Sequence, residues 1–121
     1  MYYRKQLKIL EKRLSEKKNL IQVISGPRQS GKTTLASQLT NKIKTPYIFI
    51  SADAVPSSNS LWIQQHWETA RIKLKANKSN SLVLIIDEIQ KINNWSEYVK
   101  KEWDKDRLRS VNIKILLLGS S

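Results

Sequence analysis

The sequence predicts an α/β domain in which a mostly parallel sheet lies between two layers of helices. Short stretches rich in β-branched residues alternate with longer stretches whose apolar residues recur at helical spacing. One short stretch, residues 82–86, is apolar throughout, as expected for a central strand buried on both faces. Strands that alternate with helices favour right-handed crossovers between parallel neighbours. A chain of 121 residues has room for one such domain with a sizeable core.

The expected strands cover residues 20–25, 47–51, 82–86 and 113–118. An amphipathic helix over residues 2–19 is expected to precede them, because its leucines recur every three or four residues among many Lys and Arg. One further helix is expected in each interval between strands. Their apolar faces are formed by Leu35, Ala36, Leu39 and Ile43, by Ile63, Trp67, Ala70 and Leu74, and by Trp95, Val99 and Trp103.

Two helix boundaries carry their own signals. Pro46 is expected to close the helix that begins before Leu35, because the residue that precedes a proline disfavours the helical region. Asn94 with Glu97 three residues later forms a capping-box pattern, which predicts that a helix starts at Trp95.

The composition is strongly basic, with 22 Lys and Arg against 10 Asp and Glu and a net charge of +12. Such a charge suits a partner rich in phosphate, whether a nucleotide, a nucleic acid or an anionic surface. The absence of cysteine excludes disulfides, zinc–thiolate sites and cysteine nucleophiles. The apolar runs are far shorter than the roughly 20 residues that span a bilayer, and the N-terminus does not resemble a signal peptide. We therefore expect a cytoplasmic protein that does not bind membranes.

A phosphate-binding motif follows the first expected strand. Residues 26–33 match G-x-x-x-x-G-K-[ST] at every fixed position. Gly26 and Gly31 allow backbone conformations in which successive N–H groups converge on the phosphates. Lys32 supplies a positive charge to the β and γ phosphates, and the hydroxyl of Thr33 is placed to bind Mg²⁺. This pattern predicts a P-loop that binds ATP, or another nucleoside triphosphate, together with Mg²⁺.

A chance match in an ordinary turn is the alternative interpretation of residues 26–33. Two of the chain's three glycines occupy the fixed positions, and the motif lies between an expected strand and an expected helix. Both observations favour the P-loop. Between the glycines, Arg28 and Gln29 could instead direct their side chains to solvent.

Two adjacent carboxylates, Asp87 and Glu88, follow the apolar strand over residues 82–86. In an open α/β sheet ligands lie beyond the carboxyl ends of the strands, so these side chains are expected at the same edge as the P-loop. Asp87 would hold Mg²⁺, and Glu88 would orient or deprotonate the water that attacks the γ phosphate. The alternative is that they merely begin a solvated loop.

Gly119, Ser120 and Ser121 follow the last expected strand and are expected at that edge, where a serine hydroxyl could sense the γ phosphate. An ordinary turn is equally compatible with these residues. His66 has no neighbour at metal-ligand spacing, and is expected to be an ordinary helix residue. The four tryptophans are expected to pack in or beside the core.

Taken together, the motifs resemble those of AAA-type P-loop ATPases, with a Walker A motif of the form GPRQ-x-GKTT, a Walker B motif IDEIQK and a strand that ends LLGSS. The resemblance covers residues 20–121. It implies a P-loop NTPase three-layer sandwich, a catalytic Glu88 assisted by Lys32, a sensor at Ser120, and Mg²⁺ held by Thr33 and Asp87. It also implies nucleotide contacts from Gly26, Pro27, Arg28, Gln29, Ser30, Gly31, Lys32, Thr33 and Thr34.

Members of such families continue with a fifth strand and a helical lid, in the strand order 5-1-4-3-2. The resemblance therefore implies that residues 20–121 form an incomplete core of about four strands, preceded by the basic helix in residues 1–19. The chain is then expected to be the N-terminal part of a longer ATPase. The first strand would lie at an open edge, which favours self-association.

The sequence thus favours ATP binding and Mg²⁺-dependent ATP hydrolysis, weak or absent in this chain alone. One alternative is a nucleotide-dependent switch or binding module with little turnover. Another is an ATPase associated with nucleic acid through the basic N-terminal helix.

Overall fold

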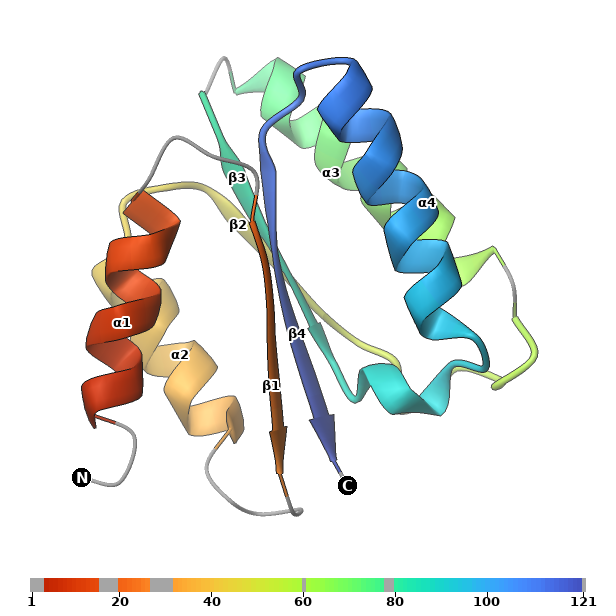
Figure 1. Ribbon diagram of the computed structural model, residues 1–121, viewed down its shortest axis with the longest axis horizontal. Coiled ribbons are helices and arrows are strands. Elements are labelled where there is room, and N and C mark those ends of the chain that lie inside the picture. The colour runs from red at the N-terminus through yellow and green to blue at the C-terminus, as the bar shows by residue number, and fades with distance from the viewer. Residues whose placement is uncertain (1–3, 16–19, 27–31, 60, 78–79, 121) are drawn as a thin grey trace.

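The computed structural model describes residues 4–15, 20–26, 32–59, 61–77 and 80–120. A four-stranded sheet lies between two pairs of helices, which gives the three layers that the sequence predicts (Figure 1). None of the helices in these ranges is long and apolar enough to cross a membrane.

The sheet contains β1 (Ile21–Gly26), β2 (Tyr47–Ser51), β3 (Leu82–Asp87) and β4 (Ile113–Ser120). The strand order is β1-β4-β3-β2 and every neighbouring pair is parallel. The expected order of these four strands is therefore confirmed. β3 and β4 occupy the centre because their apolar residues are buried on both faces, whereas β1 and β2 lie at the edges.

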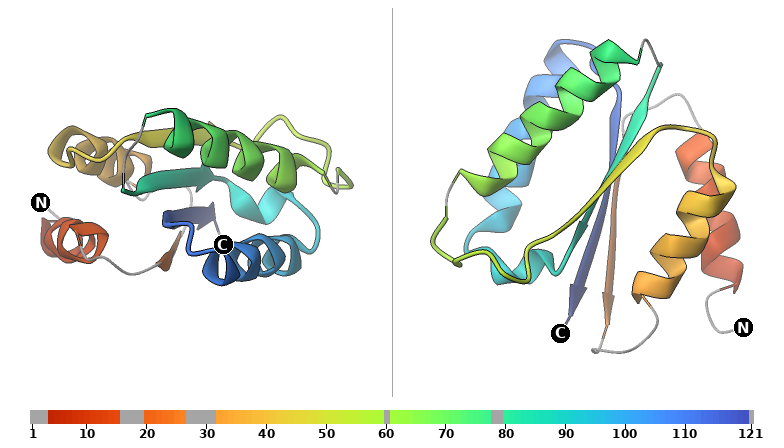
Figure 2. Two further views of the ribbon diagram at one scale, coloured as in Figure 1. Left: turned by 90° about the horizontal axis from the view of Figure 1, so that it is seen from above. Right: turned by 180° about the vertical axis from the view of Figure 1, so that it is seen from behind.

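Helices α1 (Arg4–Ser15) and α2 (Lys32–Lys42) cover one face of the sheet, and α3 (Trp62–Ala76) and α4 (Trp95–Leu108) cover the other (Figure 2). A short 3₁₀ turn, η1 (Ile89–Lys91), follows β3. Successive side chains of the central strands point to opposite faces of the sheet, so alternate residues pack against the two helix layers. Val83, Ile85, Leu116 and Leu118 pack with the leucines of α1 and α2, and Leu82, Leu84, Ile86, Ile113, Ile115 and Leu117 pack with α3 and α4.

α1 is attached to the sheet by a polar contact as well as by its leucines. Lys114 lies in β4 and is only 2% exposed. Its Nζ donates a hydrogen bond to the carbonyl oxygen of Leu14 in the last turn of α1. The carbonyls at a helix C-terminus lack partners within the helix and carry negative partial charge, so a buried ammonium is well placed there.

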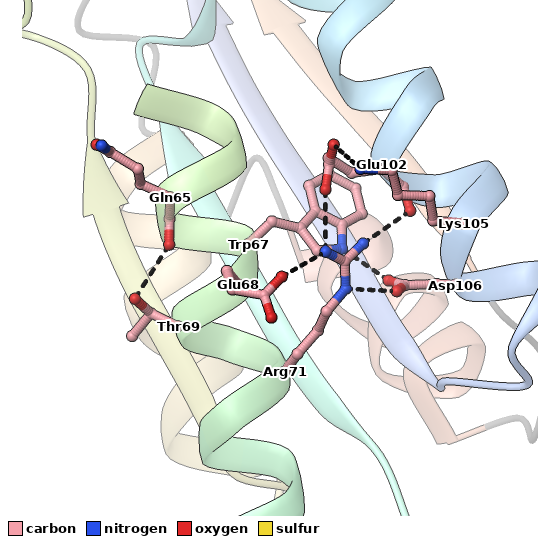
Figure 3. A network of polar contacts seen from close by, with 8 residues as sticks. All are labelled: Gln65, Trp67, Glu68, Thr69, Arg71, Glu102, Lys105 and Asp106. Carbon is pink, nitrogen blue, oxygen red and sulfur yellow. Dashed lines mark hydrogen bonds and ion pairs between the residues drawn. The ribbon is translucent and has the colours of Figure 1, made fainter. Parts of the chain in front are cut away.

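α3 and α4 share a buried polar network, shown in Figure 3. Asp106 is fully buried and accepts hydrogen bonds from Trp67 Nε1 at 2.6 Å and from Arg71 Nε at 2.8 Å. Arg71 also donates to the carboxylate of Glu102 at 2.9 Å and to Glu68 at 3.0 Å. Burial by itself lowers the pKa of Arg71, but hydrogen bonds to Asp106 and Glu68, the charge of Asp106 and the hydrogen bond to Glu102 together raise it above its ordinary value.

The capping box expected at Asn94 is wrong, although α4 does begin at Trp95. Asn94 is left-handed, with φ 60° and ψ 29°, and its side chain makes no capping hydrogen bond. Its backbone carbonyl instead accepts from the N–H groups of Glu97 and Tyr98, at 3.1 and 3.4 Å. A capping side chain requires an extended backbone at that residue, and the chain enters α4 from a tight turn in which asparagine tolerates the left-handed region.

Candidate nucleotide site

The carboxyl ends of all four strands reach one edge of the sheet. Gly26 at the end of β1 pairs with Ser120 at the end of β4, and Ser51 at the end of β2 pairs with Asp87 at the end of β3. The two pairs belong to one sheet, because β3 also pairs with β4, with Ile86 opposite Leu117. The fold therefore brings three of the motifs to the same edge, as the position of ligands in open α/β sheets predicts.

The P-loop begins at the last residue of β1, Gly26, and α2 begins at Lys32, so the motif connects a strand to a helix as expected. Helix α2 has 11 residues, and the first N–H groups of a helix have no intrahelical acceptor. They are suited to bind an anion, and the helix dipole adds to the attraction.

Several predicted contacts lie outside the described residues. These are Pro27, Arg28, Gln29, Ser30 and Gly31, the side chains of Lys32, Thr33 and Ser120, and Ser121. Thr34 is described and is exposed in the first turn of α2.

Asp87 is the half-buried last residue of β3. Its carbonyl oxygen accepts a hydrogen bond from the N–H of Ala52 at 3.0 Å, which extends the pairing of β2 with β3. Its carboxylate oxygen Oδ1 accepts from the N–H of Glu88 at 3.0 Å. The backbone of Asp87 is thus held by β2, and its carboxylate is held by the N–H of the next residue.

Glu88 turns sharply away from the strand direction. Its backbone is left-handed, with φ 55° and ψ 42°, and its carbonyl accepts from the N–H of Lys91 at 3.1 Å to close the 3₁₀ turn. Gln90 Nε2 donates to Glu88 Oε2 at 2.7 Å. Asp87 and Glu88 are neighbours in sequence, yet different groups hold their carboxylates.

β4 meets this turn at Gly119. A Cβ atom on Gly119 would lie 3.2 Å from Gln90 Oε1 and 3.6 Å from Ile89 Cγ2. A side chain at residue 119 would therefore require the end of the Gln90 side chain to shift by a few tenths of an ångström.

Sequence reasoning missed two polar residues at this edge, Gln90 and Ser51. Ser51 Oγ accepts from the N–H of Asp53 at 3.2 Å, and Asp53 forms an ion pair with Lys91 at 3.1 Å. The signal for Ser51 was its position at the carboxyl end of a predicted strand. The signal for Gln90 was a polar residue two positions after Glu88, between Ile89 and Ile92, both of which are buried.

The chemistry of these groups suits a magnesium nucleotide. Mg²⁺ prefers oxygen ligands and is commonly held by one or two carboxylates together with substrate phosphates and water. Within the described ranges, no three His, Cys, Asp or Glu side chains gather as a metal site. The carboxylates of Asp87 and Glu88 at this edge are oxygen donors of the kind that binds Mg²⁺ together with phosphate oxygens.

Comparison with solved structures supports the fold. A structure of katanin that explains its self-assembly matches with a TM-score of 0.56 and 20% identity, over 94% of this chain and 39% of that chain. PCH-2 of C. elegans matches with a TM-score of 0.59 and 18% identity, over 99% of this chain and 36% of that chain.

Curated relatives match at higher identity. An uncharacterised protein of Methanocaldococcus jannaschii is 32% identical over 104 residues, which cover 85% of this chain and 22% of that protein. The ATP-binding subunit ClpX of the ATP-dependent Clp protease of Treponema denticola is 34% identical over 90 residues, which cover 69% of this chain and 21% of that subunit. This chain thus spans about one-fifth of the length of these relatives.

The family described as "AAA domain" matches residues 18–121, which include both motifs and all four strands. The expected resemblance to AAA-type P-loop ATPases is confirmed. This chain belongs to the AAA domain family.

Proposed function

We propose that this chain binds ATP with Mg²⁺ through residues 26–34 and acts as an ATP-hydrolysing core. The observation that carries the proposal is the register of the sheet. It places Gly26, Asp87 and Ser120 at one edge, beside the helix that begins at Lys32. Family membership supports the same conclusion.

In the proposed site the backbone of residues 26–31 and the first turn of α2 hold the phosphates. Lys32 neutralises phosphate charge, and Thr33 with Asp87 holds Mg²⁺, which when bound stabilises the charge that develops on the phosphate oxygens. Glu88 orients the attacking water and accepts its proton. Ser120 hydrogen-bonds the γ phosphate or the water.

Substitution of Lys32 tests the proposal. Lys32→Ala removes a charge-assisted contact worth about 1.5–3 kcal/mol, so ATP affinity should fall at least roughly tenfold. The matched control is Lys42→Ala, which removes an exposed lysine from the last turn of the same helix and should leave affinity unchanged. Calorimetric titration with Mg·ATP measures both. Equal affinity of the Lys32→Ala variant and the parent chain would rule out the P-loop assignment.

A second candidate function is association with nucleic acid through α1. The structure buries Leu7, Leu10 and Leu14 and leaves the cations Lys8 and Lys12 exposed on the opposite side of the helix. Backbone phosphates are the partner that such a face would bind without sequence preference.

Salt dependence tests the second candidate. Binding to a duplex should weaken steeply between about 50 and 200 mM salt, and neutralising Lys8 and Lys12 together should reduce the salt slope by about two. The slope is measured by fluorescence anisotropy at several salt concentrations. A slope that the double substitution leaves unchanged would exclude α1 as the contact surface.

A further inference from the structure

The turn that follows β3 holds Glu88 in a costly conformation. A left-handed backbone is unfavourable for a residue with a side chain, and Glu88 adopts it with φ 55°. Two hydrogen bonds hold the turn, from Glu88 N–H to Asp87 Oδ1 at 3.0 Å and from Lys91 N–H to the Glu88 carbonyl at 3.1 Å. The side chain of Ile89, which is 2% exposed, anchors the turn in the core. The direction in which the Glu88 side chain leaves the backbone is therefore set by the turn.

The carboxylate of Glu88 then meets the side-chain amide of Gln90. An ionised carboxylate only accepts hydrogen bonds, so the amide must present Nε2 to Glu88 Oε2, at 2.7 Å. This requirement fixes the orientation of the Gln90 amide, so that Nε2 faces Glu88 and Oε1 faces away from it. Gln90 is exposed, so its contacts, and not burial, set the direction of its side chain.

On that other side lies Gly119 of β4. Gln90 Oε1 is 3.2 Å from the position that a Cβ atom of residue 119 would occupy. Gly119 pairs with Ser25 of β1, and the next pair in the register is Gly26 with Ser120. Gln90 therefore donates to Glu88 and also lies beside the end of β4, which carries the candidate sensor Ser120 and pairs with the P-loop glycine Gly26 of β1.

We propose that Gln90 is a positioning residue that links the carboxyl end of β4 to the carboxylate of Glu88. The inference rests on the proposed function, because it assigns Gln90 a role in orienting the group that acts on water. A shift of the β4 end moves Gln90, and the amide carries that shift to Glu88 Oε2.

The first test needs no nucleotide. The side-chain amide signals of Gln90 in a ¹⁵N–¹H NMR spectrum should shift in Glu88→Ala, which removes the acceptor, and in Gly119→Ala, which crowds Oε1. Gln65→Ala, which removes an exposed glutamine from α3, should leave them in place. Gln90 amide signals that do not move in Glu88→Ala would overturn the proposal.

The second test is a double-mutant cycle on single-turnover hydrolysis of Mg·ATP. Gln90→Ala should slow the chemical step roughly tenfold with nucleotide affinity within about twofold, as expected for loss of one hydrogen bond to a charged group. Gly119→Ala alone should also slow it. In the Gln90→Ala background Gly119→Ala should have no further effect, since the crowded group is gone. Additive effects of the two substitutions would contradict the link.

The outcomes separate this inference from the proposed function. If Glu88→Gln slows hydrolysis and Gln90→Ala does not, the inference fails and the proposed function stands. If the parent chain neither binds nor hydrolyses ATP, the proposed function fails, and the NMR comparison still decides whether Gln90 links Gly119 to Glu88. Equal thermal unfolding midpoints for parent and variants show that each variant is folded.

Discussion

Asp87 and Glu88 are adjacent in the sequence but are held in different ways. The Asp87 carboxylate accepts a backbone N–H at the end of β3, whereas the Glu88 carboxylate accepts the side-chain amide of Gln90 beyond a left-handed turn. A group held by the backbone at a strand end suits a metal ligand. A group carried on a turn suits a base that must reach a water molecule.

The two carboxylates should therefore separate binding from chemistry. Glu88→Gln should leave ATP affinity within a few-fold and slow hydrolysis by about 10²- to 10⁴-fold, because the amide cannot accept the proton. Asp87→Asn should weaken binding in the presence of Mg²⁺ and leave binding in EDTA unchanged, because it removes one charge from the metal site. Calorimetry with and without Mg²⁺ and a single-turnover assay measure these effects. Hydrolysis by Glu88→Gln at the parental rate would mean that another residue positions the water.

His66 is a packing residue whose protonation opposes folding. Its ring lies 4.6 Å from that of Trp62, and burial lowers its pKa below the ordinary value of 6.5. The unfolded chain then binds the proton at a pH where the folded chain does not. Well above pH 6.5, His66 is neutral in both states and does not change the free energy of unfolding. As the pH falls below 6.5, protonation of His66 in the unfolded chain lowers the free energy of unfolding, until the pH reaches the lower pKa of the folded chain.

Replacing His66 should remove that part of the pH dependence. Between pH 7.5 and 5.5 the urea midpoint of the parent should fall further than that of His66→Gln, since glutamine does not titrate. If the urea midpoints of the parent and of His66→Gln fall by the same amount over this range, the pKa of His66 is the same in the folded and unfolded states.

At the scale of elements, the packing of α3 against α4 depends on buried carboxylates as well as on apolar side chains. Asp106 is fully buried and Glu102 is 2% exposed, and both face Arg71. Burying charges is costly, so the network stabilises the helix pair only while every partner is present.

Asp106→Ala should therefore destabilise the fold by about 3–5 kcal/mol, because it leaves the Trp67 N–H and the Arg71 guanidinium without their main acceptor. The control is Asp104→Ala on the same helix. Asp104 is 46% exposed and lies 3.7 Å from Arg107, and its loss should change stability by less than about 0.5 kcal/mol. Urea unfolding followed by circular dichroism measures both. Similar losses for the two variants would show that the network does not stabilise the helix pair.

At the scale of the whole molecule, β1 and β2 are both edge strands in the part of the chain that the structure describes, and β1 is the edge that the family resemblance expects to be open. β1 pairs with β4 on one side, and its outward residue Val23 is 46% exposed. α1 and β1 border a groove of about 290 Å³ that includes Ile9, Leu10 and Ile24. The unpaired backbone groups of an edge strand favour pairing with a second chain.

This chain should accordingly self-associate at high concentration, and Val23→Lys should reduce the association by placing a charge on the edge. Ile72→Lys is the matched control, because Ile72 is 64% exposed on α3, away from that edge. Sedimentation velocity over a range of concentrations compares the three chains. A parent chain that remains monomeric throughout would contradict the argument from the open edge.

The sequence by itself determined the elements, the layers and the identity of the phosphate motif. These features depend on local patterns. Apolar residues at helical spacing in α3, the fully apolar run of β3 and the fixed positions of residues 26–33 each lie within one contiguous segment. The strand order followed from the family resemblance, and the structure confirms it for all four strands.

Only the tertiary structure decided the contacts between distant segments. Gln90 meets Gly119 because the register places the end of β4 beside the turn after β3, and no local pattern encodes that register. No local pattern in the sequence assigns the charged residues Asp106 and Lys114 to the core, and burial against Arg71 and against the end of α1 places them there. The side chain of Asn94 does not cap α4 because the backbone conformation of the preceding turn, and not residue preference, sets its direction.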